Sequence, residues 1–146
     1  MQEPRHLGQK SELPTVPTSF ILDPVSNPYP EIKYVARFTC PEFSSLCPVT
    51  SQPDFATMVI DYIPGKYLVE SKSLKLYLGS YRNHQAFHEA CVIQIGRHII
   101  ECVQPIWFRI AGYFNARGGI PIDVFYEDGA RVATIPDLDS RAYRGR

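Results

Sequence analysis

Cys47 lies in the stretch SLCPVTSQPDF at residues 45–55, where Pro48 holds the backbone in a non-helical conformation. A carboxylate, Asp54, follows directly after Pro53 and precedes an apolar stretch. A cysteine thiolate adds to electrophilic carbon, and a neighbouring carboxylic acid can protonate the atom that gains charge. The pair therefore indicates covalent catalysis. On residue type alone, Cys47 is equally well a small buried apolar residue, and Asp54 is equally well a turn residue.

Two further polar groups have the spacing of a binding site. His88 and Glu89 stand at the start of an expected helix, where a glutamate either complements the helix dipole or accepts two hydrogen bonds from a guanine-like edge. Lys72 and Lys75 are three residues apart and share one helix face, which is either a solvated face or a phosphate clamp. Arg117 would add a guanidinium to such a clamp. No GxGxxG follows a first strand, so a Rossmann-type nucleotide site is not predicted.

Composition narrows the classes of function. A chain of 146 residues suits one domain with its own core, and 15 Lys and Arg balance 15 Asp and Glu, so we expect neither nucleic acid nor an anionic membrane as a partner. No stretch approaches the roughly 20 apolar residues of a membrane span, and no apolar run follows the basic N-terminal residues. We therefore expect a cytoplasmic protein. The four cysteines form no CxxC pair, which favours free thiols and predicts no metal site.

Hydrophobic periodicity predicts an α+β fold. Strands are expected at 33–40, 55–63, 106–115 and 121–126, helices from just after Glu70 to about 81 and at 86–102, and loops at 41–53 and 116–119. Ser71 or Ser73 is expected to cap the first helix. The order strand, strand, helix, helix, strand, strand predicts a four-stranded antiparallel sheet with two helices on one face. Its open edges favour closure by identical subunits, with a site between them.

The chain ends differ from this central part in composition. Residues 1–30 hold six of the 13 prolines and are expected to form an extended arm, with an apolar patch at 20–22 that packs on another surface, such as a neighbouring subunit. Residues 31–136 are expected to form the single folded domain. Residues 137–146 are expected to be a flexible basic tail.

Three motifs in this order resemble one enzyme family. They are SLCPVTSQPDF at 45–55, VESKSLKLYLGSYRNHQAFHE at 69–89 and RGGIPID at 117–123. The family is that of the NADPH-dependent 7-cyano-7-deazaguanine reductases, the nitrile reductases of queuosine biosynthesis, and the resemblance covers roughly residues 34–123. It implies a tunnelling fold, with the β-β-α-α-β-β unit repeated around a ring and two stacked rings forming a homodecamer of two pentamers.

The resemblance also implies roles for individual residues. Cys47 would form a covalent thioimide with the nitrile carbon, Asp54 would donate the proton, and two hydride transfers from NADPH would give a primary amine. The residues that would hold the deazaguanine are Val69, Glu70, Ser71, His88 and Glu89. The positions associated with NADPH are Lys72, Lys75 and Arg117. The chain departs from the family at Ser51, where glycine is common, and at Pro121 and Val124.

Two other functions remain open at this point. One is a GTP cyclohydrolase or pterin-type enzyme of the same fold, many of which hold zinc with cysteine and histidine. His84, His88 and His98 do not form a convincing metal triad with Cys47 or Cys91. The other is a non-catalytic oligomeric purine-binding protein, against which the presence of both Cys47 and Asp54 argues.

Overall fold

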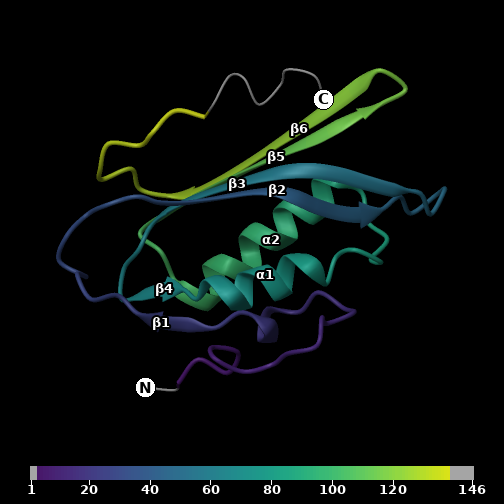
Figure 1. The fold of residues 1–146 in the computed structure, drawn as a ribbon. Helices are drawn as coiled ribbons and strands as arrows, with labels where there is room; N and C mark the ends of the chain where they lie inside the picture. Colours follow the sequence, from purple (N-terminus) through teal and green to yellow (C-terminus); the bar gives the residue numbers. More distant parts are fainter. Residues whose placement is uncertain (1–2, 139–146) are drawn as a thin grey trace.

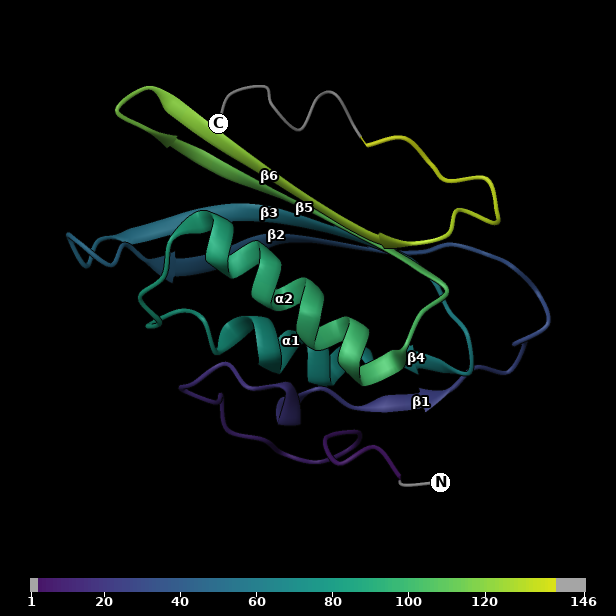
Figure 2. The same cartoon turned by 180° about the vertical axis from the view of Figure 1, so that it is seen from behind.

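The computed structural model describes residues 3–138, in which a twisted four-stranded sheet carries two helices on one face (Figures 1 and 2). In chain order the elements are a 3-10 helix Ser19–Ile21, β1 Pro24–Ser26, β2 Ala36–Leu46, β3 Pro53–Ile63, β4 Tyr67–Val69, α1 Ser71–Gly79, α2 His88–Val103, β5 Trp107–Arg117 and β6 Ile120–Gly129. The predicted antiparallel sheet with both helices on one side is confirmed.

The main sheet has the strand order β2-β3-β5-β6, with every neighbouring pair antiparallel. Side chains alternate between the faces of β3, so Met58, Ile60 and Tyr62 all point toward the helices and are at most 1 % exposed. Burying an apolar side chain of this size contributes roughly 1.5–3 kcal/mol, which is why the register of β3 is well defined. Asp54 belongs to the same alternating set and is buried with it.

Helix α2 packs its apolar face on β5 and β6. Cys91, Ile95 and Ile99 are fully buried along this face, as the helical spacing predicts. Phe87, which lies within the helix expected at 86–102, is instead the N-cap residue and is 63 % exposed, because α2 begins at His88. The helix ends where Gln104 adopts a left-handed conformation, just before Pro105.

The predicted loop at 41–53 is wrong in its first half. Strand β2 continues through Pro41 to Leu46, and only residues 47–52 lie outside the two strands. The pairing with β3 shifts between Cys40 and Phe43, which indicates a β-bulge, and β2 is an edge strand of the sheet. A proline is tolerated at such a position because its missing N–H removes no hydrogen bond from the interior of the sheet. The second predicted loop is also shorter, since only residues 118–119 separate β5 from β6.

The start of α1 follows the prediction, but its cap does not. Glu70 is the N-cap residue, and its two carboxylate oxygens accept hydrogen bonds from the backbone N–H groups of Lys72 and Ser73, both at 2.8 Å. The Ser73 hydroxyl donates to the Glu70 carbonyl instead of capping the helix. The carboxylate therefore satisfies two N–H groups that have no partner within the helix.

The N-terminal segment packs on its own chain. Strand β1 pairs with β4, two strands that the periodicity did not predict. Ile21 and Leu22 are buried in the core beside α1, and Arg5 forms an ion pair of 2.7 Å with the buried Asp23. Two of the three residues of the apolar patch at 20–22 thus pack within the chain, whereas Phe20 is 79 % exposed. From residue 139 onward, the predicted basic tail lies outside the described residues.

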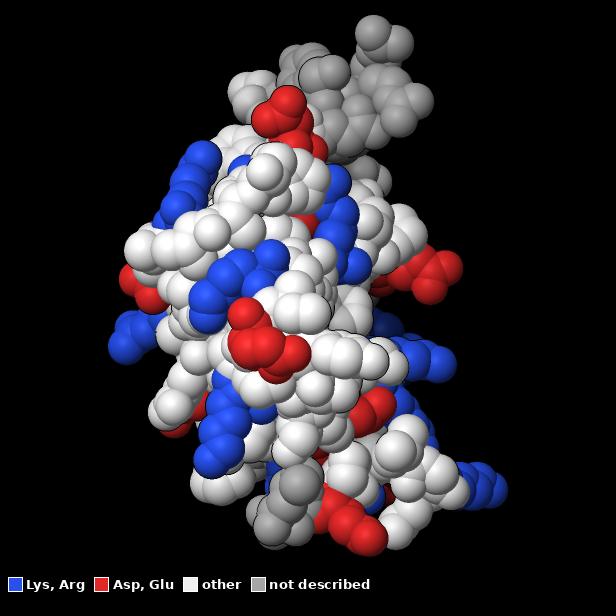
Figure 3. Space-filling view, turned by 90° about the vertical axis from the view of Figure 1, so that its left-hand side faces the viewer, with Lys and Arg blue, Asp and Glu red and all other residues white. Residues whose placement is uncertain are grey.

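The surface carries charges of both signs. Figure 3 shows lysine, arginine and acidic side chains interspersed over one end of the molecule, in keeping with the equal numbers of basic and acidic residues in the sequence. Within residues 3–138, no helix combines the length and the apolar character that a membrane crossing needs.

The close approach of α2 to the sheet should depend on Gly112. A methyl group at this position would overlap Val92 Cγ2 and lie 3.2 Å from Met58 Sδ. We expect Gly112→Ala to lower the free energy of unfolding by about 1–3 kcal/mol, measured by denaturant titration at fixed protein concentration. Gly65→Ala is the control, because its nearest contact would be an ordinary 3.4 Å to the Gln104 carbonyl. Equal losses in both variants would contradict this account.

Candidate active site

A cavity of about 390 Å³ opens where the β2–β3 loop, the start of α2 and the β5–β6 hairpin meet, at the right-hand end of the molecule in Figure 1. Five of the residues singled out in the sequence line it together: Cys47, Asp54, His88, Glu89 and Arg117. They come from four separate elements and are brought to one place by the fold.

The loop that carries Cys47 is closed by its own backbone. The Cys47 N–H donates to the Gln52 carbonyl and the Ser51 N–H donates to the Cys47 carbonyl, both at 2.9 Å. Ser51 has φ 57°, in the left-handed region where glycine is favoured, which fits the glycine that the resemblance gives to this position. A hydrogen bond of 2.7 Å from Gln85 to the Ser51 hydroxyl holds the serine in this conformation.

The thiol of Cys47 is set apart from the other three by its surroundings. Hydrogen bonds from the Thr50 side chain, from the backbone of Thr50 and Val49, and from Arg117 lower the pKa of Cys47 to about 6. Burial has the opposite effect elsewhere: it raises the pKa of Cys91 and that of Cys102 to about 11. Cys47 is therefore largely thiolate at neutral pH, and a thiolate is the nucleophilic form.

Asp54 is held between two nitrogen-bearing side chains. Its carboxylate is 1 % exposed; Arg117 Nη1 lies 2.8 Å from Oδ1 and His88 Nε2 lies 3.0 Å from Oδ2. The arginine contact is a hydrogen bond, whereas the histidine contact is close but not aligned as one within the described residues. The His88 ring stacks on Phe114 with its centroid at 3.9 Å and the planes 8° apart, which fixes its position beside the carboxylate.

Glu89 supplies the second carboxylate of the cavity. It lies in the first turn of α2, where its charge complements the helix dipole, and its side chain is exposed toward the cavity. Two carboxylate oxygens in this position can accept hydrogen bonds from two donors of a planar ligand.

The other predicted site residues lie elsewhere in the same chain. Residues 69–71 and Lys72 are at the junction of β4 and α1, beyond the opposite end of β3 from Asp54. The strand between these two ends spans roughly 30 Å. Lys72 is engaged by the N-terminal segment, with Nζ donating to the His6 carbonyl at 2.6 Å and to the Gln9 carbonyl.

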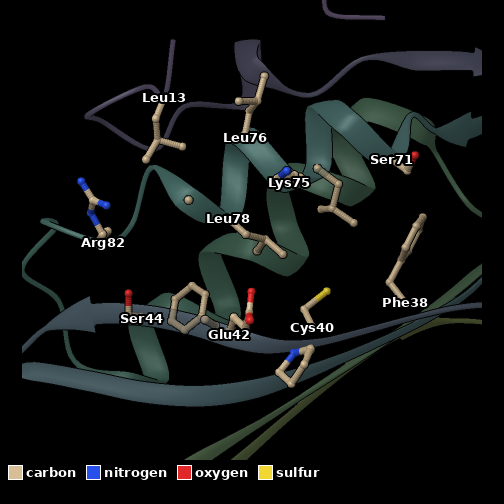
Figure 4. A pocket seen from close by; sticks show the side chains of 14 residues that line it. Leu13, Phe38, Cys40, Glu42, Ser44, Ser71, Lys75, Leu76, Leu78 and Arg82 are labelled. Atoms are coloured by element: carbon tan, nitrogen blue, oxygen red, sulfur yellow. The ribbon is translucent and has the colours of Figure 1, made fainter. Parts of the chain in front are cut away.

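Ser71 and Lys75 line a second, larger cavity of about 550 Å³ between β2 and α1. In Figure 4 both residues come from α1, with the β2 residues Glu42 and Ser44 on the opposite wall. Neither Cys47 nor Asp54 lines this cavity. The chain thus brings together five of the ten predicted site residues and leaves the other five apart from them.

Two residues that shape the site were not predicted from the sequence. Thr50 lowers the pKa of Cys47 most, and its position three residues after the thiol in a tight loop was the available signal. Phe114 supports His88 from β5, and no sequence signal marks that contact because the two residues meet only through packing. Among residues 3–138, no three His, Cys, Asp or Glu side chains gather as a metal site.

Comparisons with a family model and with individual proteins point to the same family. The family model described as QueF-like protein matches residues 53–133. The NADPH-dependent 7-cyano-7-deazaguanine reductase of Methylorubrum extorquens (strain PA1) is 56% identical over 144 residues, covering 97% of this chain and 94% of that protein. The protein of the same name from Ruegeria pomeroyi is 56% identical over 142 residues, covering 96% of this chain and 92% of its own length.

A solved structure shares the fold. The apo crystal structure of the archaeosine synthase QueF-Like superposes with a TM-score of 0.62 at 21% sequence identity, over 66% of this chain and 95% of that one. This likeness confirms the predicted α+β tunnelling-fold unit.

The lowered pKa of Cys47 should be visible in its reactivity. We expect its alkylation by iodoacetamide, followed by peptide mass mapping, to rise with a midpoint near pH 6 and to stay high above it, because the thiolate is lost only as the pH falls below the lowered pKa. Thr50→Val should move the midpoint upward, whereas Thr39→Val, on the far part of β2, should not. A wild-type midpoint near the ordinary value of about 8.5 would contradict the assignment.

Proposed function

Because this chain belongs to the QueF-like protein family, we propose that it is an NADPH-dependent 7-cyano-7-deazaguanine reductase, which reduces a nitrile to a primary amine in queuosine biosynthesis. The observation that carries the proposal is that Cys47, whose pKa is lowered to about 6, and Asp54 line one cavity of about 390 Å³. Nitrile carbon is a modest electrophile and needs a thiolate rather than a thiol. The unpaired cysteines suit the reducing cytoplasm expected from the sequence.

The first step is addition of the thiolate to the nitrile. A bond forms between Cys47 Sγ and the nitrile carbon, one π bond of the nitrile breaks, and its nitrogen takes a proton from Asp54. The product is a neutral thioimide beside an ionised Asp54, so the negative charge has passed from sulfur to carboxylate. His88, 3.0 Å from Asp54, is placed to return a proton to it.

The reduction requires four electrons, which corresponds to two hydrides from two NADPH molecules. Phosphate groups of such a cofactor need cationic partners, and Lys75 and Arg82 fit this need because both are exposed on the wall of the larger cavity. Lys72 fits less well in this conformation, since carbonyls of the N-terminal segment already accept its hydrogen bonds.

Recognition of the deazaguanine falls to Glu89 in this proposal. Its two oxygens match the ring N–H and exocyclic amine of a guanine-like edge, and its place at the start of α2 brings that edge near Cys47. His88, stacked on Phe114, completes this side of the cavity.

We propose that copies of the chain close into a ring. Within the main sheet, β2 and β6 each pair on one side only, and such edges are commonly covered by another strand. Pairing of these edges between copies would bring residues 69–71 of one copy toward the Cys47 cavity of the next. The roughly 30 Å that separates the two groups along β3 supports this arrangement. The family pattern gives ten subunits, as two stacked pentamers.

The covalent step can be tested without the cofactor. Mixing the protein with 7-cyano-7-deazaguanine should give an adduct of protein plus nitrile by intact-mass spectrometry, and a metal chelator should not prevent it. Cys47→Ala should lose both adduct and turnover, whereas Cys102→Ala, which lines neither cavity, should keep both. A Cys47→Ala variant that kept its activity would contradict the proposed mechanism.

Asp54 should be needed for protonation more than for binding. Asp54→Asn keeps the shape of the side chain but removes the acid, so we expect turnover to fall by about 10²- to 10⁴-fold. Calorimetry should show that the nitrile still binds. Loss of binding with an unchanged rate of chemistry would show that the assigned role is wrong.

A further inference from the structure

Arg117 reaches the cavity because of an irregularity in the sheet. Along β5, Arg109 and Tyr113 belong to the alternating set opposite to Phe108, Ile110 and Phe114, which is the buried set that faces the helices. Regular alternation would place Arg117 with Arg109, away from Asp54. The pairing of β5 with β6 shifts between Phe114 and Arg117, adding one residue to β5.

This extra residue reverses the alternation and turns Arg117 toward the helix side of the sheet. Bulges next to active sites often redirect a side chain in this way. The turn that follows is equally specific: Gly118 and Gly119 both have positive φ, 58° and 79°, as a two-residue hairpin requires. The local backbone is thus shaped so that Arg117 meets Asp54.

The guanidinium of Arg117 pairs with the acid and lies in the same cavity as the nucleophile. Nη1 lies 2.8 Å from Asp54 Oδ1, and the side chain lines the cavity together with Cys47, whose pKa it helps to lower. A guanidinium has five N–H donors in a fixed plane, so it can donate to two acceptor groups at the same time. The resemblance associates this position with NADPH, but in the structure its donors are directed at the nucleophile and the acid.

We propose that Arg117 is a positioning residue that holds the Cys47 sulfur and the Asp54 carboxylate together and remains paired with the one negative charge that moves between them. This inference rests on the proposed addition step. Before addition the charge is on sulfur and Asp54 carries the proton; after it, sulfur is bonded to carbon and Asp54 is ionised. The cation is paired with Asp54 and shares the cavity with Cys47, so the charge stays compensated throughout.

The alternative role, cofactor binding alone, predicts a different result. Arg117→Gln removes the cation while keeping a planar polar side chain. We expect the midpoint of Cys47 alkylation by iodoacetamide to rise by about one pH unit or more, and adduct formation with the nitrile at pH 7, without cofactor, to slow at least about tenfold. A cofactor residue would leave both measurements unchanged and weaken only NADPH binding.

Arg131→Gln is the matched control. Arg131 is also an exposed arginine paired with a carboxylate, Glu127, but it lies outside the cavity, so both measurements should keep their wild-type values. Arg117→Lys keeps the charge but not the planar fork, so adduct formation should still slow several-fold. If Arg117→Gln fails to fold, as judged by circular dichroism, the adduct rate of Arg117→Lys tests the positioning role instead.

The proposal would be wrong if Arg117→Gln and Arg117→Lys kept the wild-type pH midpoint of Cys47 alkylation and the wild-type rate of adduct formation. The alkylation profile needs no nitrile, so it separates this outcome from failure of the proposed function. If the wild-type protein formed no adduct, the proposed reductase activity would be wrong, while the effect of Arg117 on the thiolate would still be measured.

Discussion

The register of β3 against its two neighbours determines where every group of the Cys47 cavity lies. On one side, Ser45 pairs with Asp54, so β2 leaves the sheet next to the carboxylate and carries Cys47 into the loop beside it. On the other side, Ala56 pairs with Phe114, which places the Phe114 ring under His88. A slip of one residue would turn Asp54 to the opposite face, away from its partners. The buried side chains of β3 make such a slip costly, so the packing of the core also fixes the chemistry.

The same strand carries a second buried carboxylate that shows what a purely structural acid looks like. Asp61 is fully buried on the other face of β3 and accepts three hydrogen bonds, two from Arg37 and one from Arg109, at 2.6–3.0 Å. Asp54 accepts one aligned bond, from Arg117, and its second oxygen has only the unaligned contact with His88 within the described residues. A buried oxygen without an aligned donor is costly in a static core. Beside a cavity, it is a place where a proton can be gained and given up.

The sequence predicted the parts of this site that depend on local pattern. Alternation and helical spacing located the sheet and both helices, and residue types alone placed Cys47 in a loop. The predicted loop began six residues too early and the predicted second helix two residues too early. The missed features depend on contacts between distant residues. The predicted strand ends just before Pro41, because a bulge on an edge strand leaves no signature in the sequence. The link between Lys72 and the His6 carbonyl joins residues 66 positions apart, which no periodicity reports.

Glu70 shows how a fold can change the meaning of a predicted binding residue. Both of its oxygens already accept hydrogen bonds from backbone N–H groups at the start of α1, so its side chain serves as the N-terminal cap of that helix. In the proposed ring, α1 of one copy faces the cavity of the next, and the groups it can offer there are the exposed ones, the Ser71 hydroxyl and the Lys75 ammonium. Glu70 then acts on the ligand indirectly, because removing its cap would fray the turn that presents Ser71. The contribution of residues 69–71 to binding is therefore the shape of a helix start, set by a carboxylate that the ligand need not touch.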